Sequence, residues 1–324
     1  MKTCPLADTG IQVSRILYGC MGLSDRWDAS PYTPAEVKHA TALVATALEH
    51  GINFFDHADI YARGKSEQVF GEVLRALPGL RDRIIIQTKC GIRFPDIPEP
   101  GLPGRYDFSF DHIVASVDGS LQRLGIEQID VLLLHRPDPL MEPDEVARAF
   151  DAVHRAGKVR FFGVSNFSAG QIALLQASLD HPIVANQLEI SLGHPHLIDE
   201  CVGVNQTGYT YTGGRGTLDY CRMHGIQVQA WTPLARGRIL DPPEDAPEAA
   251  IALADAIADR ARESGVSREA IALAWLMRHP AGILPVIGTT KLERIAAACE
   301  ADRVALSREA WYTLFTAARG KPVP

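Results

Sequence analysis

The feature that most constrains the fold is a short apolar run that recurs eight times, each time followed by an amphipathic segment. Near-continuous apolar runs are typical of parallel strands that are buried on both faces. Eight such strands alternating with helices over residues 16 to 287 predict an α/β fold, the (β/α)8 TIM barrel. The runs are Arg15–Cys20, Asn53–Asp56, Ile84–Lys89, Asp130–His135, Val159–Val164, Ile183–Leu188, Gln227–Trp231 and Ile283–Ile287.

The two ends of the chain extend this pattern. The residues before Arg15 fit a short hairpin that closes the bottom of the barrel, and Ser307–Ala318 predicts an extra helix after the eighth unit. No linker or internal repeat divides the chain, so we expect one domain over residues 1–324. A doubly wound dinucleotide-binding sheet is the structural alternative, but the sequence contains no GxGxxG motif.

Composition excludes several classes of function. A net charge of −7 and a pI near 5.9 argue against a surface for nucleic acid or anionic membranes. The longest apolar run, 270–277, is far shorter than the roughly 20 residues of a membrane-spanning helix. The first residues lack the apolar stretch of a signal peptide, and the six cysteines form no CxxC pair. We therefore expect a cytoplasmic protein with reduced thiols, either a monomer or a weak homo-oligomer.

Polar side chains gather where three successive strands end. The second predicted strand runs into Asp56 and, five residues later, Tyr61; the third ends near Lys89 and the fourth at His135. Each residue taken alone is compatible with a structural role: the acid can form a turn, the lysine can be solvated, and the histidine can pack in the core. In a barrel, however, the carboxyl ends of the strands meet at one mouth, where active sites lie. We therefore expect an acid, a phenol, an ammonium and an imidazole to converge there.

The motifs around these residues resemble the aldo-keto reductase superfamily. The segment 51–61 (GINFFDHADIY), followed by Ser66-Glu67 and Gly71, is similar to its signature. Segments 86–89 (IQTK), 133–135 (LLH), 163–167 (GVSNF) and 185–187 (ANQ) agree with it in order. The resemblance extends from about Leu17 to about Arg294 and is closest to uncharacterised bacterial oxidoreductases that carry the LHRPDP segment of residues 134–139.

This resemblance implies reduction of an aldehyde or ketone by a catalytic tetrad of Asp56, Tyr61, Lys89 and His135. A phenol with a pKa of about 10 is a reluctant acid, and a nearby ammonium stabilises its phenolate. Tyr61 would be the general acid, Lys89 its partner and Asp56 the anchor of Lys89. His135 would donate a hydrogen bond to the substrate oxygen.

The resemblance also implies a nicotinamide cofactor, with NADPH preferred and NADH possible. Ser165, Asn166 and Gln187 would bind the carboxamide, and Trp231 would stack on the nicotinamide. The anion site at the start of the last barrel helix, residues 288–294, would bind the 2′-phosphate. Arg294 matches the phosphate-binding arginine of the family, although Gly288 replaces a lysine common in the family. The remaining expected cofactor contacts are Gly19, Cys20, Met21, Thr232, Leu234, Gly237, Arg238, Gly288, Thr289, Thr290 and Lys291.

The sequence indicates substrate specificity less clearly than it indicates the reaction. Trp27, Phe94 and Arg136, with Trp231, are candidates to line the mouth and point to a hydrophobic or aromatic aldehyde. The long segments 90–108 and 202–216 are candidate lids.

Two other functions remain open. A metal-dependent hydrolase is suggested by the histidines of 194–196 (HPH) and by His57 and Asp59, but strands seven and eight offer no further ligands, so we expect no metal. A cofactor-binding regulatory or sensor protein of the same fold, with little turnover, is the alternative to a reductase.

Overall fold

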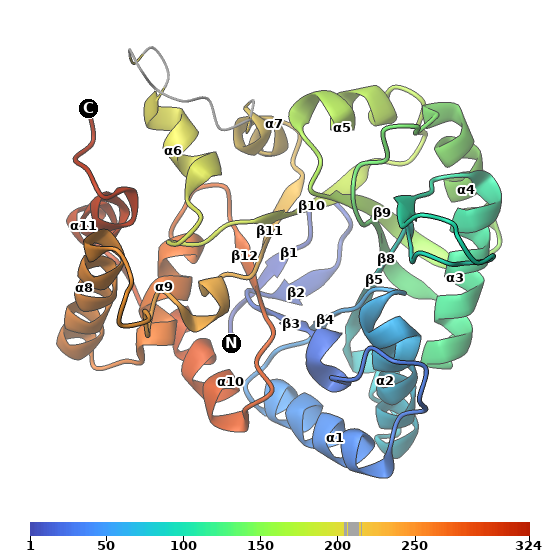
Figure 1. Ribbon diagram of the computed structural model, residues 1–324, viewed down its shortest axis with the longest axis horizontal. Helices are drawn as coiled ribbons and strands as arrows, with labels where there is room; N and C mark the ends of the chain where they lie inside the picture. Colours follow the sequence, from blue (N-terminus) through green and yellow to red (C-terminus); the bar gives the residue numbers. More distant parts are fainter. Residues whose placement is uncertain (204–205, 207–213, 215) are drawn as a thin grey trace.

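The computed structural model describes residues 1–203, 206, 214 and 216–324. At its centre is a closed barrel of parallel strands that follow one another in chain order around the ring (Figure 1). Each of the eight predicted runs overlaps one strand, which confirms the TIM barrel. The barrel strands are β3 (Leu17–Gly19), β4 (Phe54–Asp56), β5 (Ile85–Cys90), β8 (Ile129–Leu134), β9 (Val159–Ser165), β10 (Ile183–Glu189), β11 (Gln227–Trp231) and β12 (Leu284–Ile287).

Helices surround this barrel and bury its outer face (Figure 1). Ser168, Ser267 and Ser307 each cap the helix that follows, because the side chain accepts a hydrogen bond from a backbone amide of the first turn. The α-helices are α1 (Pro34–Glu49), α2 (Lys65–Ala76), α3 (Phe110–Leu124), α4 (Pro143–Arg155), α5 (Ala169–Gln176), α6 (His196–Gly203), α7 (Thr217–Met223), α8 (Glu248–Ser264), α9 (Arg268–Met277), α10 (Leu292–Cys299) and α11 (Arg308–Arg319). Short 3-10 turns are η1 (Cys20–Leu23), η2 (Tyr61–Gly64), η3 (Arg81–Arg83), η4 (Ala235–Gly237) and η5 (Glu300–Arg303).

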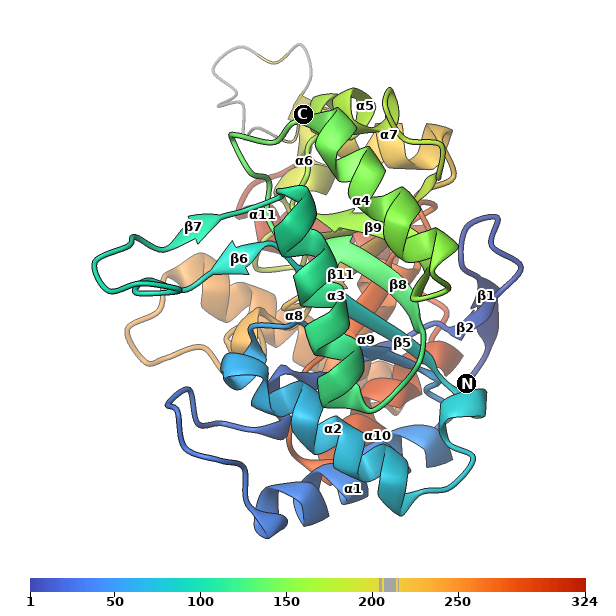
Figure 2. The same cartoon turned by 90° about the vertical axis from the view of Figure 1, so that its right-hand side faces the viewer.

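Two hairpins lie at opposite ends of the barrel (Figure 2). β1 (Thr3–Pro5) pairs with β2 (Gln12–Ser14), and β6 (Ile92–Arg93) pairs with β7 (Arg105–Tyr106). The first hairpin packs Leu6 and Val13 onto the apolar interior of the barrel. The expected hairpin cap is thereby confirmed, and α11 confirms the extra C-terminal helix.

The barrel interior changes from apolar to polar along the strands. Leu17, Phe54, Val131 and Val286 form an apolar cluster with the β1–β2 hairpin, separate from the cluster under the helices. Because side chains alternate along a strand, the residue two positions after each of these faces inward again, one layer higher. Two positions after Phe54 this residue is Asp56, and Gln87 and Gln187 likewise lie two positions after Ile85 and Ala185 of the same apolar cluster, so polar side chains lie at the upper end of the interior.

The two segments expected to form long loops differ from that expectation in part. Residues 90–108 contain the β6–β7 hairpin, so this loop has regular structure of its own. Val202 and Gly203 are the last residues of α6, and most of the remainder of 202–216 lies outside the described residues. In the part of the chain that the structure describes, no helix is long and apolar enough to cross a membrane.

Candidate active site

Three neighbouring strands bring the predicted tetrad together at the carboxyl end of the barrel. Asp56 ends β4, Lys89 lies one residue before the end of β5, and His135 follows β8 directly. Parallel pairing of β4 with β5 and of β5 with β8 places these ends side by side. Tyr61 begins the η2 turn that follows β4.

Lys89 is the centre of the site. Its ammonium nitrogen Nζ lies 2.7 Å from Asp56 Oδ2, 2.8 Å from the His57 carbonyl oxygen and 3.1 Å from Tyr61 Oη. These three acceptors match the three protons of an ammonium. The side chains of Lys89 and Asp56 are 1% and 3% exposed, so this ion pair is shielded from solvent. Buried charges of this kind require a partner and further hydrogen bonds.

The protonation states suit proton transfer from Tyr61. Burial raises the pKa of the Tyr61 phenol, while the Lys89 charge works in the opposite direction. Burial alone would lower the pKa of Lys89, but Asp56 and Tyr61 raise it above its ordinary value. At neutral pH the site therefore holds a neutral phenol against an ammonium, the arrangement of a general acid with a cation ready to stabilise its phenolate.

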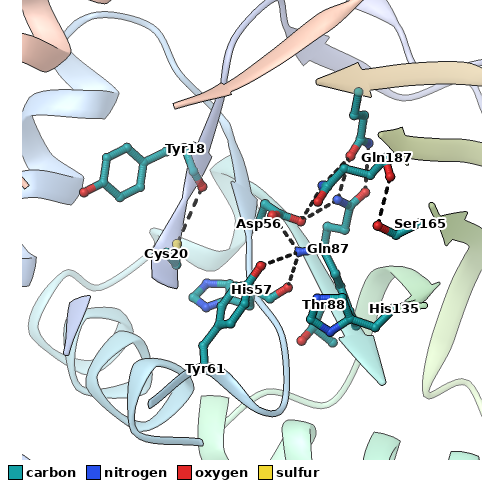
Figure 3. A network of polar contacts seen from close by, with 12 residues as sticks. Tyr18, Cys20, Asp56, His57, Tyr61, Gln87, Thr88, His135, Ser165 and Gln187 are labelled. Carbon is teal, nitrogen blue, oxygen red and sulfur yellow. Dashed lines mark hydrogen bonds and ion pairs between the residues drawn. The ribbon is translucent and has the colours of Figure 1, made fainter. Parts of the chain in front are cut away.

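His135 is a neutral imidazole beside Tyr61. Burial, followed by the charges of Lys89 and Arg136, holds the pKa of His135 well below its ordinary value. The ring meets that of Tyr61 edge to face, with centroids 5.9 Å apart (Figure 3). Its Nδ1 atom is buried and has no hydrogen-bond partner among the described residues. A neutral ring carries one N–H, which can be donated to a substrate oxygen next to Tyr61.

Three of the four residues expected around a nicotinamide lie in one hydrogen-bonded chain. Trp231 Nε1 donates to Asn166 Oδ1 at 3.0 Å, and Asn166 Nδ2 donates to Ser165 Oγ at 2.9 Å. Asn166 adopts a left-handed conformation, with φ of 64°, a strained geometry that is common at functional sites. This chain offers the amide and hydroxyl groups that a carboxamide requires.

Gln187 is placed differently from the other three. Its Nε2 atom donates to Asp56 Oδ1 at 3.1 Å and to Gln229 Oε1 at 2.9 Å (Figure 3). Its amide nitrogen is therefore directed into the barrel, because Gln187 occupies an inward position two residues beyond Ala185 in β10. A role for Gln187 at the carboxamide stays a prediction.

The residues expected at the phosphates lie around the start of α10. Tyr18 Oη donates to the Thr289 carbonyl at 3.0 Å, and Lys291 N donates to Thr289 Oγ1 at 3.2 Å. Lys291 and Arg294 are exposed, and neither forms a salt bridge within the described residues. Two cations without acidic partners at a helix N-terminus suit a phosphate.

Two further segments border this region. In the loop after β11, Thr232 and Arg236 have positive φ values of 51° and 58°. The η4 turn of this loop ends at Gly237. At the start of η1, Met21 is 53% exposed, but Cys20 is buried and its thiol donates to the Tyr18 carbonyl. Cofactor contact by Cys20 is thus restricted to its backbone, because its side chain faces the protein.

Two cation–aromatic pairs include candidate substrate residues. The guanidinium of Arg136 lies 5.4 Å from the centroid of the Trp231 ring. That of Arg63 lies 4.8 Å from the centroid of the Phe94 ring, and its Nε donates to the Trp27 carbonyl at 2.7 Å. Arg63 was not anticipated from the sequence, although its position two residues after Tyr61 was a usable signal. It joins the loops that carry Trp27 and Phe94.

The histidines of the alternative metal site lie in other environments. His57 is fully buried, its ring packs edge to face on Phe70, and burial together with the Lys89 charge lowers its pKa to about 3. The rings of His194 and His196 contact each other with centroids 4.4 Å apart. Among the described residues no group of three or more His, Cys, Asp or Glu side chains could hold a metal ion.

Comparison with known proteins agrees with this geometry. A family model described as "Aldo/keto reductase family" matches residues 15–317. The chain is 42% identical to 6-dehydroglucose reductase of Novosphingobium aromaticivorans, covering 98% of this chain and 96% of the relative. It is 37% identical to the uncharacterized oxidoreductase YcsN of Bacillus subtilis over all of both chains. The structure of glycerol dehydrogenase AKR11B4 from Gluconobacter oxydans has the same fold, with a TM-score of 0.81, 24% identity and coverage of 99% of this chain and 97% of that one. Confirming the resemblance seen in its motifs, the chain belongs to the aldo/keto reductase family of oxidoreductases, which act on small carbonyl compounds.

Proposed function

We propose that this protein reduces an aldehyde or ketone to the alcohol with NADPH, and that Tyr61 is the general acid. The observation that carries the proposal is the position of Lys89 Nζ, 2.7 Å from Asp56 Oδ2 and 3.1 Å from Tyr61 Oη. A phenol held against a buried ammonium releases its proton more readily than burial alone would allow, since the cation stabilises the phenolate.

The proposed mechanism needs one proton and one hydride. When bound, NADPH supplies the hydride that the carbonyl carbon accepts. Tyr61 transfers its proton to the carbonyl oxygen, so that the C=O double bond becomes a C–O single bond with one new C–H bond, from the hydride, and one new O–H bond, from the proton. Lys89 holds the resulting phenolate, and the Asp56 carboxylate keeps Lys89 charged. The neutral ring of His135 donates a hydrogen bond that orients the substrate oxygen.

The preference for NADPH over NADH rests on Lys291 and Arg294. Both are exposed at the start of α10 and have no acidic partner in the described part of the chain. A 2′-phosphate would supply the missing negative charge, whereas the hydroxyl of NADH would leave both cations unpaired.

Among the proposed aldehyde and ketone substrates, two chemical classes of aldehyde are to be compared. Trp27, Phe94 and Trp231 offer apolar surface to an aromatic aldehyde. The relative named 6-dehydroglucose reductase acts on an oxidised sugar, and Arg136 beside Trp231 offers donors to sugar hydroxyls. We therefore include 6-dehydroglucose beside aromatic and aliphatic aldehydes as test substrates.

The experiment is consumption of NADPH, and separately of NADH, by the purified protein with each aldehyde. We expect turnover with NADPH, and a turnover number lower by about 100-fold or more in Tyr61→Phe while NADPH binding is retained. Tyr106→Phe, a change in the exposed β6–β7 hairpin, is the matched control. Near-normal turnover of Tyr61→Phe would remove Tyr61 from the mechanism. Binding without turnover by the unmodified protein would instead favour the regulatory or sensor role.

A further inference from the structure

Three glutamines lie in the barrel directly beneath the catalytic site. Gln87, Gln187 and Gln229 come from β5, β10 and β11, and each is at most 2% exposed. Inward positions of a TIM barrel are usually filled by branched apolar residues, and the apolar Ile85 and Ala185 lie one layer below Gln87 and Gln187 in this chain. Buried amides carry a desolvation cost unless their hydrogen bonds are satisfied. The cost of burying three amides here must therefore be offset by the hydrogen bonds that they form.

The three amides form a closed network with Asp56, of which Figure 3 labels Asp56, Gln87 and Gln187. Asp56 Oδ1 accepts from Gln87 Nε2 at 2.6 Å and from Gln187 Nε2 at 3.1 Å. Gln229 Oε1 accepts from the same two nitrogen atoms, at 2.8 Å and 2.9 Å. Gln229 Nε2 in turn donates to Gln87 Oε1 at 2.9 Å. The network thus occupies one oxygen of the carboxylate whose other oxygen binds Lys89.

The charge of Asp56 dictates the direction of every bond in this network. An ionised carboxylate only accepts, so Gln87 and Gln187 must both present their NH2 groups to it. Their second N–H groups then need an acceptor, which is the Gln229 carbonyl oxygen. Gln229 consequently holds both amides in the orientation that serves an ionised Asp56, although it forms no hydrogen bond to Asp56 or Lys89 itself.

We propose that Gln229 is a positioning residue for the reduction: through Gln87 and Gln187 it holds the Asp56 carboxylate in the orientation that anchors Lys89 against Tyr61. The proposal deepens the reductase function and rests on it. No motif of the sequence points to Gln229, which lies 142 positions from Gln87 along the chain. It acts through other side chains, so its loss affects the rate of the chemical step more than substrate binding.

The first test is Gln229→Leu, a change of similar size that removes both the acceptor and the donor. We expect kcat for aldehyde reduction to fall about tenfold while KM stays within about twofold. The matched control is Gln227→Leu in the same strand, because within the described part of the chain the Gln227 amide donates only to the backbone carbonyls of Val228 and Gly282. A wild-type kcat in Gln229→Leu, or an equal loss in the control, overturns the proposal.

A second variant, Gln229→Glu, keeps the shape and makes the network depend on pH. When protonated, the new carboxyl can accept from Gln87 and Gln187 and donate to Gln87 Oε1, which reproduces all the bonds. When ionised, it faces that oxygen with a second acceptor and adds a negative charge near Asp56. Burial and this neighbouring charge raise the pKa of the new carboxyl above its usual value of about 4.3.

We therefore expect kcat of Gln229→Glu to approach that of the wild type at low pH and to fall as pH rises through that pKa. The wild type and Gln227→Glu should lack this transition. A pH profile of Gln229→Glu that matches the wild type at every pH overturns the proposal. This variant therefore tests the proposal even if Gln229→Leu does not fold.

Crystal structures of the wild type and of Gln229→Glu at low and high pH separate this proposal from the reductase function. At high pH we expect Asp56 Oδ1 to lose an amide donor and the Asp56–Lys89 contact to lengthen from 2.7 Å. An unchanged Asp56 in both crystals would refute the positioning role even if the protein were active. Absence of turnover in the wild type would refute the reductase function while leaving this structural readout intact.

Discussion

Two carboxyl groups beside the proposed catalytic site, those of Glu67 and Asp59, lie in the field of the same arginine, Arg123. Glu67 is fully buried, and its Oε2 accepts from Arg123 Nε at 2.7 Å while its Oε1 accepts from Thr88 Oγ1 at 2.6 Å. Asp59 Oδ1 is buried without a hydrogen-bond partner among the described residues. Burial, followed by the charge of Glu67, raises the pKa of Asp59 to about 7. Asp59 therefore holds its proton up to about neutral pH.

This raised pKa gives the free energy of unfolding a definite pH dependence. An unfolded aspartate has a pKa of about 3.9, so between about pH 4 and pH 7 the folded protein binds the proton more tightly than the unfolded chain. Stability from this group is therefore complete at low pH, falls as pH rises through that window, and is constant above it. A shift of about three units at 1.36 kcal/mol each amounts to about 4 kcal/mol at pH 8.

The variant Asp59→Asn removes this titration while keeping the shape of the side chain. We expect urea denaturation to show a free energy of unfolding, relative to the wild type, that increases by up to about 1.4 kcal/mol per pH unit between pH 4 and 7. Any fixed cost of the amide shifts the whole curve but not its slope. Asp82→Asn, at an exposed position, is the control and should give a constant difference. A constant difference for Asp59→Asn as well would refute the reasoning.

Three further changes test other parts of the molecule. Lys89→Met leaves the buried Asp56 carboxylate without its cation. Urea denaturation should show a free energy of unfolding lower by about 3–5 kcal/mol, and the turnover number should fall about 100-fold or more. A variant with wild-type stability would contradict the argument from burial. Arg294→Ala should raise KM for NADPH about tenfold and leave KM for NADH nearly unchanged, and equal changes would separate Arg294 from the 2′-phosphate. Gly71→Ala places a Cβ atom 2.6 Å from the Arg123 carbonyl oxygen, so the thermal midpoint should drop by an amount equivalent to about 1–3 kcal/mol; an unchanged midpoint would show that α2 and α3 can separate freely.

The fold, and the convergence of Asp56, Tyr61, Lys89 and His135 at one end of the barrel, could be predicted because both depend on local patterns. The run predicted at 130–135 overlaps β8 (Ile129–Leu134), because an apolar run of this kind is a buried strand wherever it lies in the barrel. Parallel strands in a closed ring bring their carboxyl ends to one rim, and Asp56, Lys89 and His135 stand at those ends. The side-chain contacts then follow from strand order, which for this fold is chain order.

What could not be predicted depends on contacts between distant segments. Arg63 joins Trp27 to Phe94 because η2 places two successive residues, Ala62 and Arg63, in left-handed conformations that sequence patterns rarely signal. The orientation of Gln187 is of the same kind: its position in β10 is clear from the sequence, but whether its amide serves a ligand or Asp56 is decided by Gln229, in another strand.

The inward positions of two of these glutamines can nonetheless be predicted from the alternation of side chains along a strand. Gln87 lies two residues before Lys89 and Gln229 two residues before Trp231, so each faces inward one layer beneath a residue of the active site. An amide at an inward position of a barrel has no solvent to satisfy it and must find a polar partner in the same layer. The carboxylate of Asp56 is the charged group within reach, and it is the group that the chemistry needs to keep ionised. The layer beneath the tetrad therefore belongs to the active site as much as the rim does, because it decides how the anchor of Lys89 is held.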